Sequence, residues 1–526
     1  MRKIELLVRL SLLVAVMLLA IGLPAAADPA PPANIKNETL DETADHITKS
    51  LRQLDLEVRE GYFQMWGADE CLPTYELMGS CFFNNPAAPY ILSVLPYWPD
   101  EFVDPATKGV FGETREGYGS TYRFDPHEAI VIFGYLPPEA HYFGLQSYTF
   151  THKDKYETDN ETYPFLFSLD AQDVFFHEVP LNPKRIGFFN SLSDSINNVV
   201  IENQLDKPSW EQFCYFIITP DGHMDREIRQ VLVSLGVDES EIFTEFIPEN
   251  VRLGLNKNAD DFASALRYSM PLDGGGDGTA SYEWRHNPTL RLLRVRDTSP
   301  GYHKEPFPAW GPDSPEARTG VSEAYLSEDL TKLVHAVAKA WDQDCEDDSA
   351  FGDRLRTFGD IQSAPMNVLG PKCAEIGMDC AGDTQDASYG FCPGITFDDG
   401  EVWAVIGTLG TETGNATYVG LGLNNFDLRL GAKNIEYTKL EGSAAFYGDG
   451  DIANLDKFFV YYFARDCSDL KSWTHGYCTE VEDSPLVLPA GDRAAFTERD
   501  YIKPGTQRGP DSTQLLPSRA LKLARP

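Results

Sequence analysis

The chain has 526 residues, of which 42% are hydrophobic and 12% aromatic, so it carries ample material for packed cores. Its 81 acidic residues outnumber its 44 basic ones and give a formal net charge of −37 at pH 7. A field of this sign repels phosphate backbones and anionic lipid surfaces, which argues against nucleic acid and acidic membranes as partners.

The N-terminal segment has the layout of a secretory signal peptide. Basic residues near the start precede an apolar run at residues 10–23, and the small residues 25–27 suit cleavage. The run is shorter than the roughly 20 residues that span a bilayer, which disfavours a retained membrane anchor. We therefore expect residues 1–27 to be removed, no membrane span in the mature chain, and a secreted or periplasmic location.

The first expected element after this leader is an amphipathic helix at Leu40–Gly61, where apolar residues recur every three or four positions. The strongest strand signals follow at Ala129–Leu136 and Tyr142–Phe150, separated by a proline-marked turn at residues 137–140. Two such runs predict a β-hairpin or two adjacent strands. We expect this pair to form the centre of a sheet.

The next elements predict a strand–helix–strand unit that supports parallel pairing. Phe213–Thr219 is a buried strand, Met224–Leu235 has helical spacing, and Ile242–Ile247 is extended again. The spacing at Asp260–Tyr268 predicts a second helix, and Leu290–Val295 a further strand.

Residues 297–320 hold five prolines and show neither a helical nor a strand period, which is typical of a domain boundary. Beyond them an apolar stripe predicts a long helix at residues 322–341, followed by a cysteine-rich insert. The tail from Thr497 is polar and is expected on the surface. Four strands of a second sheet are expected at Val402–Leu409, Ala416–Leu423, Leu428–Tyr437 and Leu455–Phe463.

These elements predict an α+β protein of two β-rich domains with antiparallel or mixed, sandwich-like sheets. The strand–helix–strand unit belongs to the first domain, and the long helix opens the second. The expected segments are a leader at 1–27, a lead-in with the first helix at 28–62, the first domain at 63–296, a linker at 297–320 and the second domain at 321–526.

Nine cysteines fit an oxidising compartment, and we expect eight of them to form four disulfides. Short loops close most easily, which favours the pairs Cys71–Cys81 and Cys467–Cys478. The ninth, Cys214, lies in an apolar run and is expected to be a buried thiol. A zinc site is the alternative for the clustered cysteines, but they lack a C-x2-C pair. The connectivity stays open for Cys345, Cys373, Cys380 and Cys392.

The stretch from Tyr122 to His152 resembles exported bacterial proteins that carry a domain of unknown function. The resemblance covers about thirty residues and rests on the order of Tyr122, Asp125, Pro137, His141-Tyr142 and Gln146. The chain departs from that family at His141, where Arg is usual, and it lacks the family's Asn-Arg-Asp lead. The resemblance implies an exported protein with β-rich domains, and it implies no reaction.

Candidate catalytic residues are the carboxylates Asp398, Asp399 and Glu401, which directly precede a strand containing Trp403. A glycosidase sets two carboxyl groups roughly 5–10 Å apart beside an aromatic platform. The alternative is a solvated turn, because Asp and Gly are ordinary turn residues.

Histidines offer a second candidate site. Four of the ten fall between residues 127 and 177, and acidic residues accompany His127 and His141 near the ends of the central strands. Such a cluster suits acid–base work or a metal, although no H-x-H or H-E-x-x-H spacing is present. The motifs of serine hydrolases, dinucleotide-binding folds and P-loops are absent.

Two Asp/Gly loops are candidates for Ca²⁺, which prefers six to eight oxygen ligands. Neither has the full EF-hand spacing, and a plain turn is the alternative. No other cofactor is evident. The four candidate ligands are Asp273, Asp277, Asp449 and Asp451.

Triplets of the form N-x-[ST], which matter only in a source that glycosylates, begin at Asn37, Asn160 and Asn415.

Two functions are consistent with these observations. The first is a secreted hydrolase that uses carboxylates in a cleft, with a neutral glycan as the candidate substrate. The second is a non-catalytic extracellular binding or surface protein stabilised by Ca²⁺. A deep pocket with converging ionisable groups favours the first, and filled oxygen cages on a flat surface favour the second.

Overall fold

The protein was analysed as a computed structural model. The expected leader, Asn160, Cys345, Asp399 and Asp449 lie outside the part of the chain that the structure describes. The described residues are 35–154, 175–300, 302–308, 318–342, 370, 373–374, 377–398, 400–448 and 450–524.

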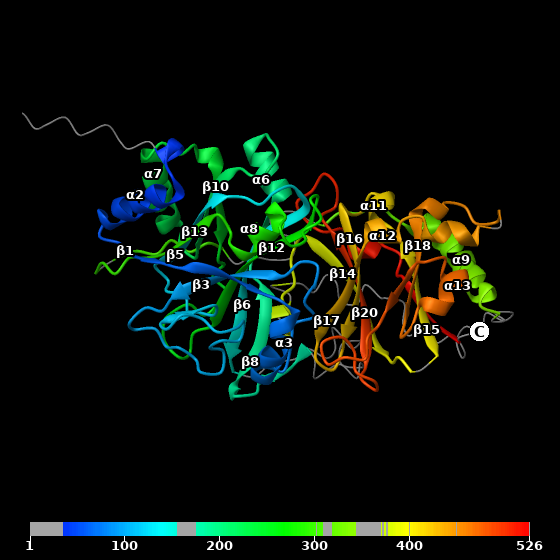
Figure 1. The fold of residues 1–526 in the computed structure, drawn as a ribbon. Helices are drawn as coiled ribbons and strands as arrows, with labels where there is room; N and C mark the ends of the chain where they lie inside the picture. Colours follow the sequence, from blue (N-terminus) through cyan, green and yellow to red (C-terminus); the bar gives the residue numbers. More distant parts are fainter. Residues whose placement is uncertain are drawn as a thin grey trace, which may run out of the picture.

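The first half of the molecule is built on two sheets that face one another across an apolar core (Figure 1). One sheet has the strand order β1 (Glu57–Glu60), β13 (Leu290–Arg296), β5 (Glu128–Tyr135), β10 (Phe213–Thr219) and β11 (Ile242–Phe246). The other has the order β2 (Tyr62–Trp66), β3 (Tyr90–Pro96), β12 (Asp261–Pro271), β6 (Ala140–Lys153), β8 (Asn182–Ser191) and β7 (Glu178–Val179), with β4 (Tyr118–Gly119) on β3 and β9 (Ile196–Asn197) on β6.

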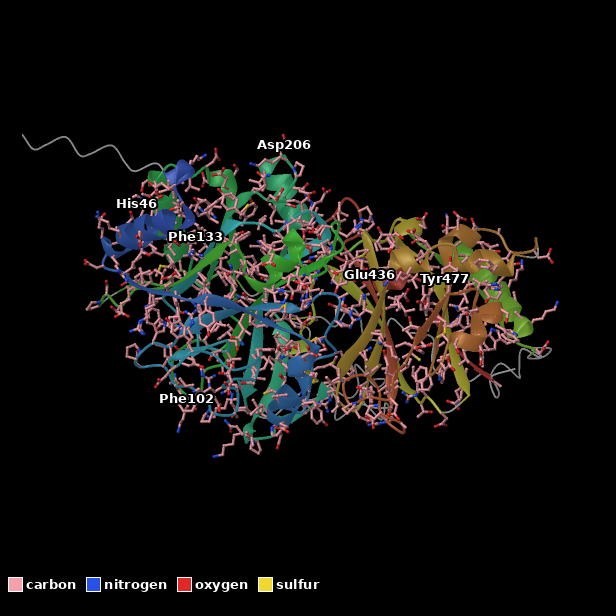
Figure 2. The ribbon with its side chains drawn as sticks, in the orientation of Figure 1. His46, Phe102, Phe133, Asp206, Glu436 and Tyr477 are labelled. Atoms are coloured by element: carbon pink, nitrogen blue, oxygen red, sulfur yellow. A yellow bond between two sulfur atoms is a disulfide. The ribbon has the colours of Figure 1, made fainter. Side chains whose placement is uncertain are left out.

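The predicted strand–helix–strand unit is confirmed. Strands β10 and β11 pair in parallel, and α7 (Gly222–Ser234) connects them. Helix α7 packs with α2 (Leu40–Arg52) on the outer face of the five-stranded sheet, where Phe133 lies in the core beneath them and His46 points outward (Figure 2). Helix α2 is shorter than predicted, because the chain after Arg52 turns back to form β1.

The predicted hairpin is wrong. Strands β5 and β6 belong to different sheets, and the proline turn carries the chain across the core from one layer to the other. Strand β5 pairs with β10 and β13, and β6 pairs with β12 and β8. The continuous apolar run of β5 reflects cover on both faces, by the core on one side and by helices on the other.

The helix predicted at Asp260–Tyr268 is also wrong, because this segment is β12. Its apolar residues fit a helical period, but β3 and β6 flank it and take up its backbone hydrogen bonds. Both faces of β12 are buried, so no alternation of polar and apolar residues marked it as a strand.

The second half is a sandwich of two four-stranded sheets with α9 (Ser327–Ala340) on its outer face (Figure 1). The polar tail predicted on the surface from Thr497 instead supplies a strand to each sheet. One sheet has the order β14 (Ala387–Ile395), β20 (Ala494–Tyr501), β16 (Tyr418–Asn425) and β17 (Leu430–Glu436). The other has the order β19 (Cys478–Glu480), β18 (Phe458–Ala464), β15 (Glu401–Thr408) and β21 (Arg519–Ala524).

Short helices complete the described fold, and no helix among these residues is both long and apolar enough to cross a membrane. With its antiparallel and mixed sheets, the molecule is the β-rich α+β protein that the sequence predicts. The short helices are α3 (Cys71–Met78), α6 (Asn198–Leu205), α8 (Ala280–His286), α11 (Gly410–Thr413), α12 (Tyr437–Leu440) and α13 (Lys471–Thr474).

Three disulfides close short loops. The predicted pairs Cys71–Cys81 and Cys467–Cys478 are confirmed, and Cys373 pairs with Cys380. Cys214 is a buried thiol as expected. Cys392, expected in a fourth bridge, is also buried and lies outside these three. Burial raises the pKa of each of these two thiols to about 12, so neither is a reactive thiolate at neutral pH.

Candidate functional site

Asp398 and Glu401, the two of the proposed carboxylates that the structure describes, lie at the surface of the second half. Asp398 is exposed, and its backbone N–H donates to the Glu401 carboxylate at 3.0 Å. Glu401 also pairs with Lys522. Trp403 is buried in the core of the sandwich and presents no face to a ligand. Among the described residues, the expected carboxylate pair beside an aromatic platform is therefore not assembled.

Asp398 does line a surface hollow of about 340 Å³. We call it the Asp398 hollow; it is lined by Phe397, Asp398, Arg465, Val481, Glu482, Asp483, Ala490 and Gly491. Three of its charged groups already have partners: the Arg465 guanidinium donates to backbone carbonyls, Glu482 pairs with Lys433, and the Asp483 carboxylate accepts from the backbone N–H of Ala490.

The four histidines of the predicted cluster are engaged separately, and within the described residues no contact joins one of them to another. The proposed acid–base site of His127 and His141 is therefore not assembled. The four contacts are His127 with Tyr302, His141 with Tyr437, His152 with Asp260 and His177 with Asp379.

The first candidate calcium loop serves local structure. The Asp273 carboxylate accepts hydrogen bonds from the backbone N–H groups of Gly275 and Ser281 and caps the loop before α8. Asp277 and Asp451 are exposed. In the part of the chain that the structure describes, no three or more His, Cys, Asp and Glu side chains are arranged to hold a metal ion.

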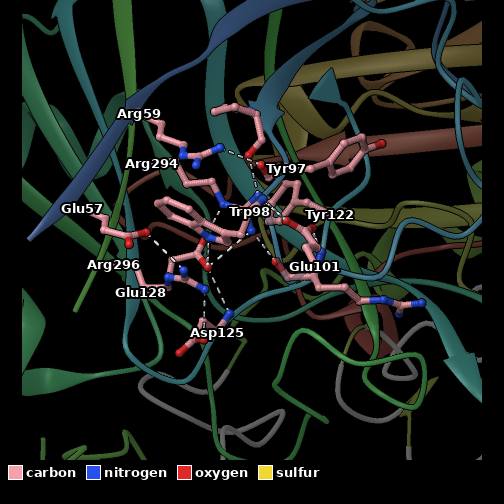
Figure 3. A network of polar contacts seen from close by, with 12 residues as sticks. Glu57, Arg59, Tyr97, Trp98, Glu101, Tyr122, Asp125, Glu128, Arg294 and Arg296 are labelled. Carbon is pink, nitrogen blue, oxygen red and sulfur yellow. Dashed lines mark hydrogen bonds and ion pairs between the residues drawn. The ribbon is translucent and has the colours of Figure 1, made fainter. Parts of the chain in front are cut away.

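The first half buries an extensive ion-pair network around Arg294 (Figure 3). This guanidinium is fully buried and donates to Glu101 and Glu128, while the Trp98 indole N–H donates to Glu128 at 2.9 Å. The backbone carbonyls of Pro96 and Arg123 accept its remaining donors. Because each nitrogen of the Arg294 guanidinium donates to a group within the protein, this buried cation is not available to a ligand.

A different arrangement lies between the two sheets of the second half, where three buried carboxyl groups surround a small cavity of about 20 Å³. This volume holds one water molecule. We call it the carboxyl cavity. Strand β20 contributes Glu498 and Asp500, which are two positions apart and so point to the same face. The third carboxyl group, Glu323, precedes α9, and the segment Leu515–Pro517 forms part of the wall.

Glu323 is saturated with hydrogen bonds. One of its oxygens accepts from Thr413 Oγ1 at 2.6 Å and from Asn415 Nδ2 at 2.9 Å. The other accepts from Thr408 Oγ1 and from the backbone N–H of Leu516, both at 2.8 Å. Four donors compensate a negative charge at this position and hold it in place. The Asn415 side chain is buried in this contact and is not available for a glycan.

Glu498 and Asp500 have far fewer partners. One Glu498 oxygen accepts from Ser518 Oγ at 2.7 Å. Within the described residues, no donor contacts the Asp500 carboxyl group, although only 6% of this residue is exposed. An unpartnered buried carboxyl group is unusual, because burial without a hydrogen bond costs free energy.

The electrostatics of this pair favour bound protons. Burial raises the pKa of Glu498 to about 8, with the charge of Glu323 adding to the effect. Burial and the charges of Glu498 and Glu323 raise the pKa of Asp500 well above its ordinary value. The pair therefore keeps at least one proton at neutral pH.

Sequence reasoning missed this site because Glu498 and Asp500 lie in the tail that was expected on the surface. The signal that could have found it is the alternation in β20, where Phe496, Glu498 and Asp500 share one face and Thr497 and Arg499 the other. That alternation predicts a strand, but charged residues on the core-facing side are typical of a solvated face.

No protein-family model and no curated protein matches the sequence. Two solved structures are similar over most of their length: the VPA0106 protein from Vibrio parahaemolyticus and an uncharacterised protein from Burkholderia cenocepacia. The first is 10% identical with a TM-score of 0.32, and the second is 8% identical with a TM-score of 0.31. Each alignment covers 92% of this chain and 96% of the other. Likeness at this level carries no conclusion about function.

Proposed function

We propose that the protein is an exported hydrolase in which Glu498 and Asp500 activate a water molecule. The observation that carries this proposal is the buried Asp500, which has no donor among the described residues and lies beside a second carboxyl group at a cavity the size of one water. Two carboxyl groups that share a proton are a recurring device for hydrolysis, because one acts as base while the other acts as acid.

The roles follow from the contacts. Asp500, which has no donor among the described residues, accepts the proton of the water once the pair has released one of its own protons. Glu498 retains its proton to about pH 8 and is the group able to donate one to a leaving group. The fixed negative charge of Glu323 favours protonation of both neighbours, so it tunes the pair without touching the substrate.

The charge around the cavity defines the substrate class. No Lys, Arg or His is among its described lining residues, and the chain carries a large negative charge. Anionic substrates would be repelled, so we propose a neutral substrate, with a glycan as the first candidate. Because the cavity admits only water, the scissile bond must approach from its partly open side.

Export is supported by two further observations. Disulfides form and persist mainly outside the reducing cytosol, and this chain forms three within its described residues. The leader-like first 27 residues and the resemblance of the Tyr122–His152 stretch point the same way. N-terminal sequencing of the protein from a secreting host should find a mature chain that begins near Asp28.

The hydrolase proposal is tested with a panel of neutral glycoside, ester and peptide substrates. We expect turnover by the wild-type protein and a loss of roughly 100-fold or more in kcat for Glu498→Gln and Asp500→Asn, the usual size of an acid–base contribution. Glu401→Gln, a surface carboxyl group, serves as the matched control and should retain full activity. Turnover that survives both substitutions would reject these roles.

A second candidate function, non-catalytic binding of an extracellular ligand, is favoured by the Asp398 hollow, whose 340 Å³ lies within the usual size of a ligand pocket. This function predicts no turnover with any substrate of the panel. It also predicts ligand binding that Asp398→Asn weakens and Asp500→Asn leaves unchanged.

A further inference from the structure

We propose that the carboxyl cavity also binds a primary ammonium group, either the ammonium ion or the end of a small primary amine, in place of its water. Occupancy would inhibit the site, because a bound cation displaces both the water and the shared proton. The inhibition rests on the proposed hydrolase function, whereas the binding itself does not.

Size is the first argument. The cavity has room for one water molecule, and an ammonium nitrogen with its protons fills a comparable space. A quaternary ammonium group, with four carbon substituents, is too large. The cavity therefore selects among cations by volume.

Hydrogen-bonding capacity is the second argument. An ammonium group is a pure donor, with three N–H bonds when one substituent is carbon. Two carboxyl groups of the cavity supply acceptors: the Asp500 carboxyl group, and the Glu498 oxygen that Ser518 does not contact. Glu323 needs no further donor, since each of its oxygens already accepts two hydrogen bonds.

Charge is the third argument. The titratable groups that line the cavity are Glu323, Glu498, Asp500 and Tyr389, and no basic residue is among its described lining. A monovalent cation beside three carboxyl groups relieves the repulsion that otherwise forces protons onto the pair. Charge-assisted N–H···O bonds to carboxylates are among the stronger hydrogen bonds in proteins.

A metal ion fits less well. Within the described residues these three carboxyl groups are not arranged as a metal site. Calcium requires oxygens at about 2.3–2.6 Å, and N–H···O bonds to a carboxylate reach about 2.7–2.9 Å. A hydrogen-bonding cation therefore needs a less close convergence of oxygens than a coordinated metal ion does.

Binding should depend on pH in a defined direction. The pair must release a proton to receive the cation, so affinity should rise with pH up to about pH 8, where Glu498 loses its own proton. The methylammonium ion, whose pKa is close to that of a lysine side chain at about 10.4, stays charged throughout this range.

The test uses the full mature chain and methylammonium chloride, measured by isothermal titration calorimetry at pH 6 and pH 8.5. We expect binding at least tenfold tighter at pH 8.5 and proton release at pH 6, the latter read from buffers of different ionisation enthalpy. Tetramethylammonium and sodium chloride at the same ionic strength should not bind. Comparison of ammonium chloride with butylammonium chloride then decides whether the free ion or the end of an amine is preferred.

Asp500→Asn should abolish binding, and Asp398→Asn, the same chemical change in the Asp398 hollow, should not. Equal binding of tetramethylammonium, unchanged binding by Asp500→Asn, or absence of proton release at pH 6 would each overturn the proposal. If Asp500→Asn fails to fold, the size selectivity and the proton release of the wild-type protein still decide whether the proposal holds. Methylammonium binding without substrate turnover would reject the hydrolase alone, and turnover without methylammonium binding would reject this inference alone.

Discussion

Glu245, on β11, is another buried carboxyl group that no cation contacts among the described residues. It accepts hydrogen bonds from the backbone N–H and hydroxyl of Ser147 at 2.6 and 2.7 Å, and from the Gln146 amide at 3.2 Å. The Ser193 hydroxyl also donates to it at 3.2 Å. Burial outweighs these donors and raises its pKa to about 7. Glu245 therefore titrates near neutral pH although it is enclosed between the two sheets of the first half.

This carboxyl group makes stability depend on pH. From about pH 4.5 to pH 7 the folded state keeps a proton that the unfolded state has lost, so the free energy of unfolding falls as pH rises through this window. The free energy of unfolding falls by an amount on the order of 3 kcal/mol across this window, and the titration of Glu498 extends the fall to about pH 8. Urea unfolding from pH 5 to pH 8 should show the slope in the wild-type protein and a reduced slope in Glu245→Gln.

The exposed Glu76 provides the control, because Glu76→Gln should leave the slope unchanged. Parallel pH profiles for the wild-type protein and Glu245→Gln would contradict a titration of Glu245 between folded and unfolded states.

At the scale of elements, the backbone conformation of β5 and its pairing with β13 depend on one glycine. Gly134 has a φ of 141°, which L side chains rarely adopt, and a Cβ there would collide with the backbone of Thr289. This close approach lets β5 pair with the first residue of β13. The glycine is therefore required both by its own conformation and by its neighbour.

We expect Gly134→Ala to destabilise the protein by more than about 1 kcal/mol, measured as the free energy of unfolding in urea. Gly276→Ala is the control: its Cβ would meet no atom within 4 Å and its φ is not positive. That change should stay within about 0.5 kcal/mol of the wild-type value. Equal effects of the two substitutions would show that the close contact at β5 has no energetic weight.

At the scale of the whole molecule, buried polar contacts join the two halves. The Asp386 carboxylate accepts hydrogen bonds from Tyr142 at 3.0 Å, Ser195 at 2.7 Å and Asn197 at 3.3 Å, all from the first half. Arg508 of the second half pairs with Asp194 at 2.6 Å. Groups buried this way lose their partners if the halves separate, so the halves should unfold together.

Differential scanning calorimetry should therefore show one transition for the wild-type protein. Asp386→Ala removes the acceptor of Tyr142, Ser195 and Asn197 and also that of Thr384, and it should destabilise the protein by several kcal/mol, at about 1–3 kcal/mol for each group left unsatisfied. It should also broaden or split the transition. Asp398→Ala, which removes an exposed carboxylate, should leave the profile unchanged. Two separate transitions in the wild-type protein would contradict this coupling.

The sequence by itself determined the elements that bury one face and expose the other, because this pattern can be seen within a short stretch of the chain. A helical stripe is enough to identify α7 and α9, since one face of each packs on a sheet. The short-loop disulfides and the buried thiol of Cys214 also followed from local spacing and composition. The β-rich α+β class followed from the sum of these elements.

Only the tertiary structure decided the rest, because it depends on partners distant in the chain. Strand β12 is buried on both faces, so its period was ambiguous until β3 and β6 took up its hydrogen bonds. The separation of β5 and β6 into two sheets depends on which strands flank each one. The carboxyl cavity brings Glu323 together with Glu498 and Asp500. The residue type of a charged side chain does not show that it is buried, because its burial depends on the groups folded around it.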